Sequence, residues 1–504
     1  MAQPGTRDGS FGNVGIWSHQ WEDGSRCFGS LVEPNGDIIV VGSVTLSGSN
    51  FNAAIARVLV DGELDEDFNG MGIFMPPAPS FNPAQEFSAT AREVDGKIVC
   101  VGRKLGEAQQ IIATRNNANG TADITFGVDG IMHIDIGGDY PIAEDVAILP
   151  NGKILVAAQR YNGTTRDWVL LRLNDNGQPD ATFGSQGLIV TEVAEEGAVP
   201  KKIMLQPDGK ILLAGGSRFN DVGNNYHFAL VRYDANGALD PEFGSGGRVI
   251  TPIGDNASPI AGVALLPNGS IIASGTVREG DDVGFAVVKY EPNGQLSSLF
   301  GEDGMVLTFH LDSGIPLAGN AGVVVDADGR IIIGGTSGDY LALARYQSNG
   351  TLDVSFGMQG IARLSPYDED WWSGTSISLQ PDQRIIMGAT GFRSGAGYLM
   401  HVVRIISGLN LHVNDLIAGA QQFLVYPNPL PQFTTLQFEL DRSSAISISL
   451  NDEQGRLVRV FATERLTGAG LHQERLDLSG IANGRYLIRV EANEREANIV
   501  VVKG

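Results

Sequence analysis

The six residues 367–372 bring together side chains that suit the binding of a ligand. Three of them are aromatic and three are acidic: Tyr367, Asp368, Glu369, Asp370, Trp371 and Trp372. Aromatic rings beside carboxylates suit stacking on sugar rings or contact with a cationic peptide. With aromatic residues from two other variable segments, the candidate ligand-binding residues are Trp21, Tyr161, Tyr367, Asp370, Trp371 and Trp372. The alternative is that Trp371 and Trp372 pack inside the fold beside Trp17 and Trp21.

Catalytic and metal chemistry has much less support in the sequence. The seven histidines are scattered without the His-x-x-x-His spacing of a zinc site. Neither a Gly-x-Ser-x-Gly nucleophile motif nor a phosphate-binding loop occurs. Asp326-Ala327-Asp328-Gly329 resembles the start of a calcium loop but lacks its further ligands and closing Glu. We therefore predict no catalytic residue, no metal and no cofactor. Acidic residues in loops leave a glycan-active hydrolase as a minor alternative: Asp23, Asp139, Asp282 and Asp370.

The composition indicates a globular protein that does not bind nucleic acid. The formal net charge of −23 over 504 residues argues against a partner with a phosphate backbone. No run of 18 apolar residues is present. The two cysteines, Cys27 and Cys100, make no disulfide framework, and we expect buried free thiols. No secretory signal is visible after Met1, and we expect that one was removed before Ala2.

A motif of the form Asp-x-x-Phe-Gly-x-x-Gly recurs seven times, about every 57 residues. Its first and fourth positions are Asp8/Phe11, Asp65/Phe68, Asp123/Phe126, Asp180/Phe183, Asp240/Phe243, Ser297/Phe300 and Asp353/Phe356. A fixed period of this size is typical of repeat architectures. The repeat is therefore the unit from which the fold has to be read.

Each repeat reads as four short strands separated by turns. The four segments are typified, in order, by residues 188–190, 144–149, 211–215 and 228–233, which come from different copies of the repeat. A Pro-x-Gly turn such as Pro207-Asp208-Gly209 links the second and third strands. Four strands without helical periodicity match one blade of a β-propeller. We predict an all-β fold with a seven-bladed β-propeller at residues 1–407.

The ends of the repeat region favour a closed ring. The chain enters inside a unit, at Asp8 to Gly15, and the last unit stops at His401 to Ile405 without its Phe-Gly strand. The first strand would complete the seventh blade, which removes exposed sheet edges. An open β-solenoid is the alternative.

The repeat resembles a known bacterial family. The turn Gln206-Pro207-Asp208-Gly209-Lys210, the strand 228–233 and Asp240-x-x-Phe243-Gly244 are similar to the delta-60 repeat. That resemblance covers about four-fifths of the chain. It implies a large secreted or surface protein of bacteria, and no single activity.

The two faces of such a ring differ in sequence. The Pro-x-Gly and Asp-x-x-Phe-Gly turns are short and uniform. We predict that they share one face and have a structural role, in which the Asp caps backbone N–H groups and the Phe packs between blades. The variable loops fall on the opposite face, where binding residues usually lie. They include the segments 19–23, 138–140, 160–162, 218–226, 278–282 and 367–372.

The repeat pattern ends near residue 407, and a different domain follows. Residues 408–423 read as a linker, and residues 424–504 as short alternating strands, which predicts a small Ig-like β-sandwich. An accessory Ig-like module is the plain interpretation of this segment.

The same segment resembles the type IX secretion C-terminal sorting domain of Bacteroidetes. The residues that carry the resemblance are Tyr426, Pro427, Asn428, Pro429, Gly455, Gly484, Tyr486 and Lys503. It implies an outer-membrane translocon and its associated shuttle and sorting proteins as partners. It also implies an extracellular or cell-surface location, reached through periplasm and outer membrane. We therefore expect an exported binding or scaffold protein whose propeller takes a glycan or protein ligand. A structural or assembly protein is the alternative.

Overall fold

The computed structural model describes residues 3–503 except 22, 47–49, 78–83, 107–108, 196, 219–225, 310–317, 366–368, 409–422, 427–432, 441–443, 453–455, 469, 483 and 493–494. The chain divides into two compact units, residues 1–408 and 409–504, which we describe separately. Among the described residues, no helix is long and apolar enough to cross a membrane.

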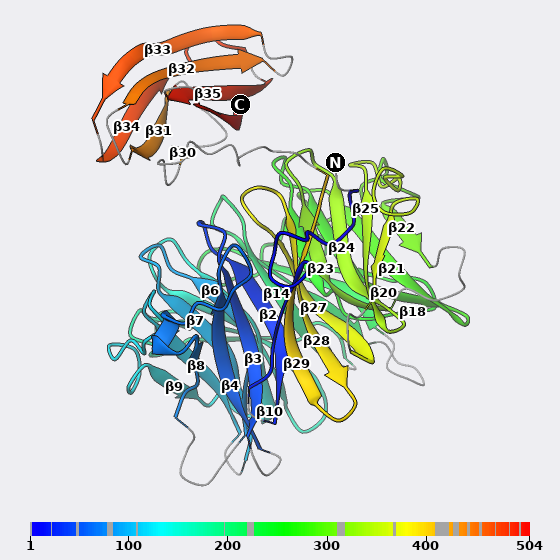
Figure 1. Cartoon of the computed structure of the whole chain (residues 1–504). Helices are drawn as coiled ribbons and strands as arrows, with labels where there is room; N and C mark the ends of the chain where they lie inside the picture. Colours follow the sequence, from blue (N-terminus) through cyan, green and yellow to red (C-terminus); the bar gives the residue numbers. More distant parts are fainter. Residues whose placement is uncertain are drawn as a thin grey trace. The chain divides into compact units, whose positions relative to one another are not determined.

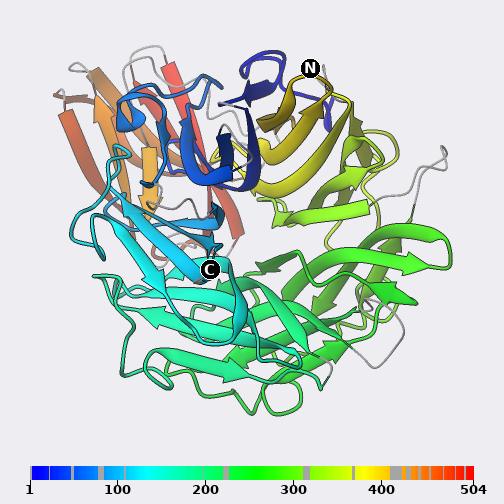
Figure 2. The same ribbon diagram turned by 90° about the horizontal axis from the view of Figure 1, so that it is seen from below.

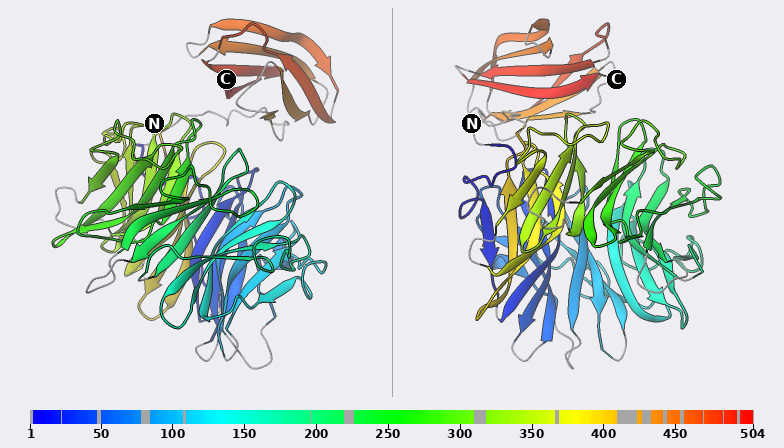
Figure 3. Two further views of the ribbon diagram at one scale, coloured as in Figure 1. Left: turned by 180° about the vertical axis from the view of Figure 1, so that it is seen from behind. Right: turned by 90° about the vertical axis from the view of Figure 1, so that its right-hand side faces the viewer.

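The described strands of the first unit fall into seven groups of four antiparallel strands (Figures 1 and 3). The first strands of the groups are β2 (Gly24–Val32), β6 (Gln85–Arg92), β10 (Asp139–Ile148), β14 (Ala198–Leu205), β19 (Gly262–Leu265), β23 (Ala318–Val325) and β27 (Trp371–Leu379). The second strands are β3 (Ile38–Leu46), β7 (Ile98–Lys104), β11 (Ile154–Tyr161), β15 (Ile211–Arg218), β20 (Ile271–Glu279), β24 (Ile331–Ser337) and β28 (Ile385–Arg393). We number the groups 1 to 7 in this order.

The third strands are β4 (Asn50–Val58), β8 (Gln110–Asn116), β12 (Arg166–Leu173), β16 (Tyr226–Tyr233), β21 (Asp282–Tyr290), β25 (Tyr340–Tyr346) and β29 (Gly397–Ile405). The fourth are β5 (Ile73–Phe74), β9 (Ile131–Ile134), β13 (Leu188–Thr191), β17 (Arg248–Thr251), β22 (Met305–Thr308), β26 (Ile361–Leu364) and, in group 7, β1 (Ile16–His19). A short strand, β18 (Asn256–Ala257), pairs with both β16 and β20, and one 3-10 turn, η1 (Phe68–Gly70), precedes β5.

The groups are arranged around a common centre, as Figure 2 shows. The first strand of each group contacts the first strand of the next, from β2 through β6, β10, β14, β19 and β23 to β27, and β27 contacts β2. The first strands of the groups are therefore the innermost strands. The predicted all-β propeller architecture is confirmed, and the complete circle of contacts is what an open solenoid would lack.

Strand β1 is joined to group 7 although it lies at the other end of the unit. It pairs antiparallel with β29 in the register Ile16↔Val403, Trp17↔Val402 and Ser18↔His401. Beside it, the N–H of Gly5 donates to the carbonyl of Ile406 at 2.7 Å. The predicted completion of the last repeat by the first strand is thus present in the pairing.

The hydrophobic core lies between neighbouring groups. Leu155 and Trp168 of group 3, for example, pack in one cluster with Leu213 and Val231 of group 4. Each buried side chain of this size contributes roughly 1.5–3 kcal/mol relative to exposure. Both cysteines are free and buried in such clusters, as predicted.

The Asp-x-x-Phe-Gly motif forms a turn that is held by an ion pair. In group 2, Nε of Arg115 lies 2.7 Å from Oδ2 of Asp123, and the other oxygen of Asp123 accepts from the backbone N–H of Thr125 at 3.1 Å. The guanidinium of Arg115 also covers the ring of Phe126 at 5.2 Å. Equivalent ion pairs join Arg57–Asp65, Arg172–Asp180, Arg232–Asp240, Arg345–Asp353 and Arg404–Asp8.

The same arginine reaches across to the next group. Nη1 of Arg115 donates to the carbonyl of Asp175 at 2.7 Å, and Arg232 makes the corresponding bond to Pro292 at 2.5 Å. Group 5 departs from the pattern, because Lys289 stands where the arginine would be and Ser297 where the Asp would be. The motif therefore ties each turn to its own strand and to its neighbour.

The second unit contains two sheets. Strands β30 (Phe423–Tyr426), β31 (Phe433–Leu440) and β34 (Gly470–Asp477) form one. Strands β33 (Leu457–Thr467), β32 (Ser444–Asp452), β35 (Gly484–Ala492) and β36 (Arg495–Lys503) form the other. One core contains side chains of both sheets, including Leu436 and Phe438 from the first and Ile448, Ile488 and Val501 from the second. Two sheets with one core between them form a sandwich, and its Ig-like character stays a prediction.

Candidate functional site

The propeller has a turn face and a loop face. The turn face carries the hairpins between first and second strands and the motif turns between third and fourth strands. The loop face carries the hairpins between second and third strands and the crossings from one group to the next. Asp326, in the sequence that resembles a calcium loop, lies on the turn face and pairs with Arg330 at 2.9 Å. The candidate ligand-binding residues that the structure describes all lie at strand ends or crossings of the loop face.

Trp371 forms an aromatic cluster on the loop-face end of group 7. Its ring stacks on Phe392 at 5.9 Å and meets the edge of Tyr398 at 6.1 Å. The guanidinium of Arg26, from group 1, lies 3.9 Å from the centroid of Tyr398. Trp371 is only partly buried, so one part of its surface stays open to solvent.

Trp372 has a different environment from its neighbour. Its side chain is 1% exposed and its indole N–H donates to Glu369 at 2.9 Å. Successive side chains of a strand point to opposite faces, so the pair divides between surface and core. A buried ring has no surface for a ligand, and Trp372 is therefore a core residue, although it lies in a different cluster from Trp17 and Trp21.

Trp21 lies in a second aromatic group, near the end of β1. Its ring is 4.1 Å from that of His19 and 5.9 Å from that of Trp17. Trp17 is buried, whereas Trp21 is partly exposed and packs on the cores beside β2 and β4. Trp21 therefore has some free surface, but it serves mainly to cover the junction of groups 7 and 1.

Asp370 is exposed and organises its own loop. Its carboxylate accepts hydrogen bonds from the backbone N–H of Ser394 at 2.7 Å and from its hydroxyl at 2.5 Å. These hydrogen bonds lower the pKa of Asp370, so the group is ionised at neutral pH. Tyr367, the remaining aromatic residue of this stretch, lies outside the described residues.

A serine, a histidine and a glutamate meet where β1 joins β29. The hydroxyl of exposed Ser18 is 2.7 Å from Nδ1 of buried His401, and Nε2 of His401 is 3.7 Å from Glu369. Burial lowers the pKa of His401 to about 4, against the opposing effect of Glu369. A base with this pKa accepts a proton poorly at neutral pH, and 3.7 Å is longer than a hydrogen bond. The contact is therefore best understood as a polar link that holds β1 in place.

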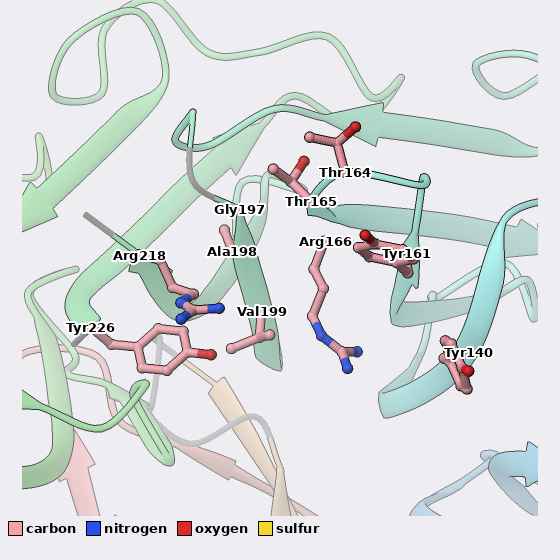
Figure 4. A pocket seen from close by; sticks show the side chains of 10 residues that line it. All are labelled: Tyr140, Tyr161, Thr164, Thr165, Arg166, Gly197, Ala198, Val199, Arg218 and Tyr226. Atoms are coloured by element: carbon pink, nitrogen blue, oxygen red, sulfur yellow. The ribbon is translucent and has the colours of Figure 1, made fainter. Parts of the chain in front are cut away.

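A cavity of about 240 Å³ opens on the loop face between groups 3 and 4 (Figure 4). Its walls come from the start of β10, the hairpin between β11 and β12, the start of β14, and the facing ends of β15 and β16. The side chains that line it with polar groups are Tyr140, Tyr161, Thr164, Thr165, Arg166, Arg218 and Tyr226. We call this cavity the tyrosine–arginine pocket.

Hydrogen bonds fix the walls of the tyrosine–arginine pocket. The hydroxyl of Tyr161 donates to the carbonyl of Gly163 at 2.9 Å, and Nη1 of Arg166 donates to Oε1 of Gln159 at 3.0 Å. The backbone N–H of Arg218 donates to the carbonyl of Gly197 at 2.8 Å, which joins the two walls of group 4. The guanidinium of Arg218 faces the ring of Tyr226 at 5.9 Å.

The candidate ligand-binding residues predicted from the sequence lie in separate parts of the loop face. Tyr161 lies in the pocket of groups 3 and 4, whereas Trp371 and Asp370 belong to group 7, which is not adjacent. The candidates predicted from the sequence do not include Arg166, and they include Tyr140, Arg218 and Tyr226 only as parts of variable loops. Their common signal is position: each stands at the loop-face end of a strand.

In the second unit, three of the sorting residues lie on two paired strands. Gly484 pairs with Lys503, and Tyr486 two residues on pairs with Val501. The hydroxyl of Tyr486 donates to the carbonyl of Ala482 at 2.9 Å. Tyr426 lies in β30, opposite Thr435 of β31. Pro427, Asn428, Pro429 and Gly455 lie outside the described residues.

Two family models match this chain. The one described as a β-propeller domain of unknown function (DUF5122) matches residues 33–68, 149–183, 206–243 and 327–356. The one described as a secretion system C-terminal sorting domain matches residues 424–503. The first covers motif turns and their flanking strands, and the second covers the two-sheet unit.

Comparison with whole proteins adds little. No match was found among curated proteins. Among solved structures, Drosophila Semaphorin 2a is similar over 100% of both chains, with 9% identity and a TM-score of 0.46. Polysaccharide lyase Uly1 is similar over 78% of this chain and 93% of its own, with 11% identity and a TM-score of 0.46. Similarity at this level carries no argument about function.

The family matches agree with the two units of the structure and with the motifs that distinguish them. A type IX sorting domain marks proteins that are exported to the cell surface or the extracellular space, and its presence implies recognition by that secretion machinery. The chain thus combines β-propeller repeats that match DUF5122 with a C-terminal sorting domain, and it is a cargo of type IX secretion.

Proposed function

We propose that the propeller is a ligand-binding module that works outside the cell, and that the tyrosine–arginine pocket is its binding site. The observation that carries this proposal is the difference between the two faces. Arg–Asp–Phe contacts use the turn face for structure, whereas the loop face holds a walled cavity with three tyrosines and two arginines. Such convergent aromatic and polar groups in a preformed hollow are typical of ligand sites.

The domain assignment supports this division of labour. We propose that the seven strand groups are the blades of a closed propeller at residues 1–407, that residues 408–423 link it to the rest, and that residues 424–504 are the export signal. The break in contacts after residue 408 and the sorting-domain match from residue 424 support these bounds. The type IX translocon and its associated shuttle and sorting proteins are the partners of the second unit.

We propose a binding role without catalysis. The hydroxyl of Ser18 meets a histidine whose pKa of about 4 makes it a weak base, and Glu369 is already engaged by Arg393 and Trp372. The other candidate functions of the propeller are those of a hydrolase and of a self-assembling surface protein. A concentration-dependent rise in mass by light scattering, without added ligand, would favour self-assembly.

A binding screen with the exported full-length protein tests the proposal. The protein is applied to arrays of glycans and of peptides, beside a Tyr161→Ala variant and a Tyr398→Ala variant from the aromatic cluster of group 7. We expect at least one ligand class to bind, and the signal to fall for Tyr161→Ala alone. Loss for Tyr398→Ala alone would move the site to group 7, and no binding on any array would contradict the proposed function.

A further inference from the structure

The chemistry of the tyrosine–arginine pocket indicates which ligand it takes. We propose that the pocket binds an acidic sugar, with the carboxylate of a hexuronic acid unit on Arg166 and the sugar ring among the tyrosines. This inference rests on the proposed binding function and makes it specific. It follows from the charge, the hydrogen-bonding capacity and the size of the pocket.

The charge of the pocket is opposite to that of the protein. The chain has 58 acidic and 35 basic residues, yet the ten residues that line the pocket include two arginines and no acid. Two carboxylates close to these residues along the chain are engaged elsewhere, because Asp167 pairs with Arg160 at 3.4 Å and Glu144 with Lys201 at 2.7 Å. An anion is therefore attracted to this hollow more than to the surrounding acidic surface.

Arg166 has the capacity to hold a carboxylate. Its side chain makes no ion pair in the part of the chain that the structure describes, and its hydrogen bond to the neutral amide of Gln159 uses Nη1. The edge formed by Nε and Nη2 is the one that binds both oxygens of a carboxylate. Figure 4 shows the guanidiniums of Arg166 and Arg218 on the two sides of Val199, and both residues line the pocket.

The remaining lining suits a sugar ring. Tyr140, Tyr161 and Tyr226 offer ring faces for C–H groups, and their hydroxyls, with those of Thr164 and Thr165, offer donors and acceptors for sugar hydroxyls. At about 240 Å³ the cavity lies just below the roughly 300–1,000 Å³ of sites for drug-sized ligands. This size matches one sugar unit of a longer chain. An acidic peptide shares the carboxylate but needs less hydroxyl bonding.

Titration calorimetry with the full-length protein tests the inference. The probes are oligogalacturonate, the corresponding neutral galactose oligomer, a sulfated galactan fragment and a Glu-rich peptide. We expect only oligogalacturonate to bind well, and binding to weaken with added salt because it depends on charge. Arg166→Ala should weaken it at least roughly tenfold, which is what losing a charge-assisted bidentate contact costs in affinity. Arg166→Lys should fall between the two, because it keeps the charge and loses the fork.

Arg278→Ala is the matched control. Arg278 stands on β20 at the same position as Arg218 on β15, but it lies one group away, is exposed and does not line the pocket. This variant should bind like the parent, and the melting temperature of each variant shows that it is folded. Preferred binding of the neutral oligomer, the sulfated fragment or the peptide, or binding unchanged by Arg166→Ala, would overturn the acidic-sugar inference and leave the binding function standing. A protein that binds none of the probes and nothing on the wider arrays would contradict both.

Discussion

At the scale of the residue, the repeated motif shows that a side chain can recur with one structural role without forming a ligand-binding site. Six of its copies pair an arginine with an Asp, cover a Phe ring and bind a carbonyl of the next group or turn, whereas Lys289 and Ser297 replace the pair in group 5. A charged pair with little exposure keeps its value only while both partners remain. The motif therefore fixes turns and leaves ligand contact to other residues.

The motif carboxylates should make the propeller sensitive to acid. Burial alone would raise the pKa of Asp123, but hydrogen bonds from Thr125 and the charge of Arg115 lower it to about 2. The pKa values of Asp8, Asp180, Asp240 and Asp353 are lowered as well. An Asp with a lowered folded-state pKa stabilises the fold fully above its unfolded value of about 3.9, and this stabilisation is lost as the pH falls through the folded-state pKa.

We therefore expect the urea midpoint to drop between about pH 4 and pH 2. Asp123→Asn should lower the free energy of unfolding at pH 7 by about 2 kcal/mol, because it removes one charge-assisted hydrogen bond while Arg115 keeps Glu93 and Asp175 as partners. It should also flatten this part of the pH profile. Ser297→Ala, at the position that lacks the pair, is the control and should have little effect. An unchanged pH profile in Asp123→Asn would contradict the assignment.

Val14 offers a gain in stability. It has φ of 54°, a backbone region that a β-branched residue rarely adopts, and its side chain is 52% exposed. The corresponding positions of other motifs hold Asp129, Gln186 and Gly246, also with positive φ. Val14→Asn should raise stability by about 0.5–1 kcal/mol, since Asn tolerates this conformation. Val14→Ile, measured by the same thermal unfolding, should give no gain.

At the scale of the element, the closing strand decides whether the seventh group is complete. β1 pairs with β29, and the segment before it carries Asp8 and Phe11, which meet Arg404 at 2.9 and 4.7 Å. Without this strand, β29 would present an unpaired edge. The stability of the whole ring thus depends on a strand of four residues and the turn in front of it.

Phe11→Ala tests this dependence. Phe11 is fully buried, so its truncation should cost about 3–5 kcal/mol and should speed hydrogen exchange of the amides in β1 and β29. Phe126→Ala, at the equivalent place inside the ring, should lose similar stability without that local exchange. Leu299→Ala, exposed at 89%, should change neither. Equal exchange at β29 in Phe11→Ala and Phe126→Ala would show that closure does not rest on this residue.

The elements show how far the sequence alone could lead. The period of about 57 residues and the Phe and Gly anchors were enough to predict the strands, because buried strands and tight turns leave strong local signals. Trp371 and Trp372 were harder, since only the pairing of β27 decides which ring faces the core. Arg166 and Tyr226 carry no periodic signal at all. They meet only because groups 3 and 4 are neighbours in the ring.

At the scale of the whole molecule, the proposed binding function and the export signal lie in separate units. The propeller supplies the pocket, and the sandwich carries Gly484, Tyr486 and Lys503 on two paired strands. Such a division lets changes in the loop face leave the export signal untouched. The family matches, which fall in separate parts of the chain, agree with it.

Removal of residues 424–504 should therefore stop export without unfolding the propeller. We expect the truncated chain to remain in the periplasmic fraction in a host with type IX secretion, while the Tyr161→Ala variant of the full chain reaches the surface normally. Fractionation and protease digestion of intact cells measure both. Appearance of the truncated chain in the medium at the level of the parent would contradict the role of this domain.

The pairing of Ser18 with His401 also has a kinetic consequence. These two residues are 383 positions apart in the chain, and bringing such distant points together costs roughly 5 kcal/mol of loop-closure entropy, against about 2 kcal/mol for a ten-residue hairpin. Contacts of such long sequence separation form slowly, so the hairpins within each group should form first and the ends should meet last. Until they meet, a nascent propeller is an open arc with one unpaired edge, and that interval is when it is most prone to aggregate.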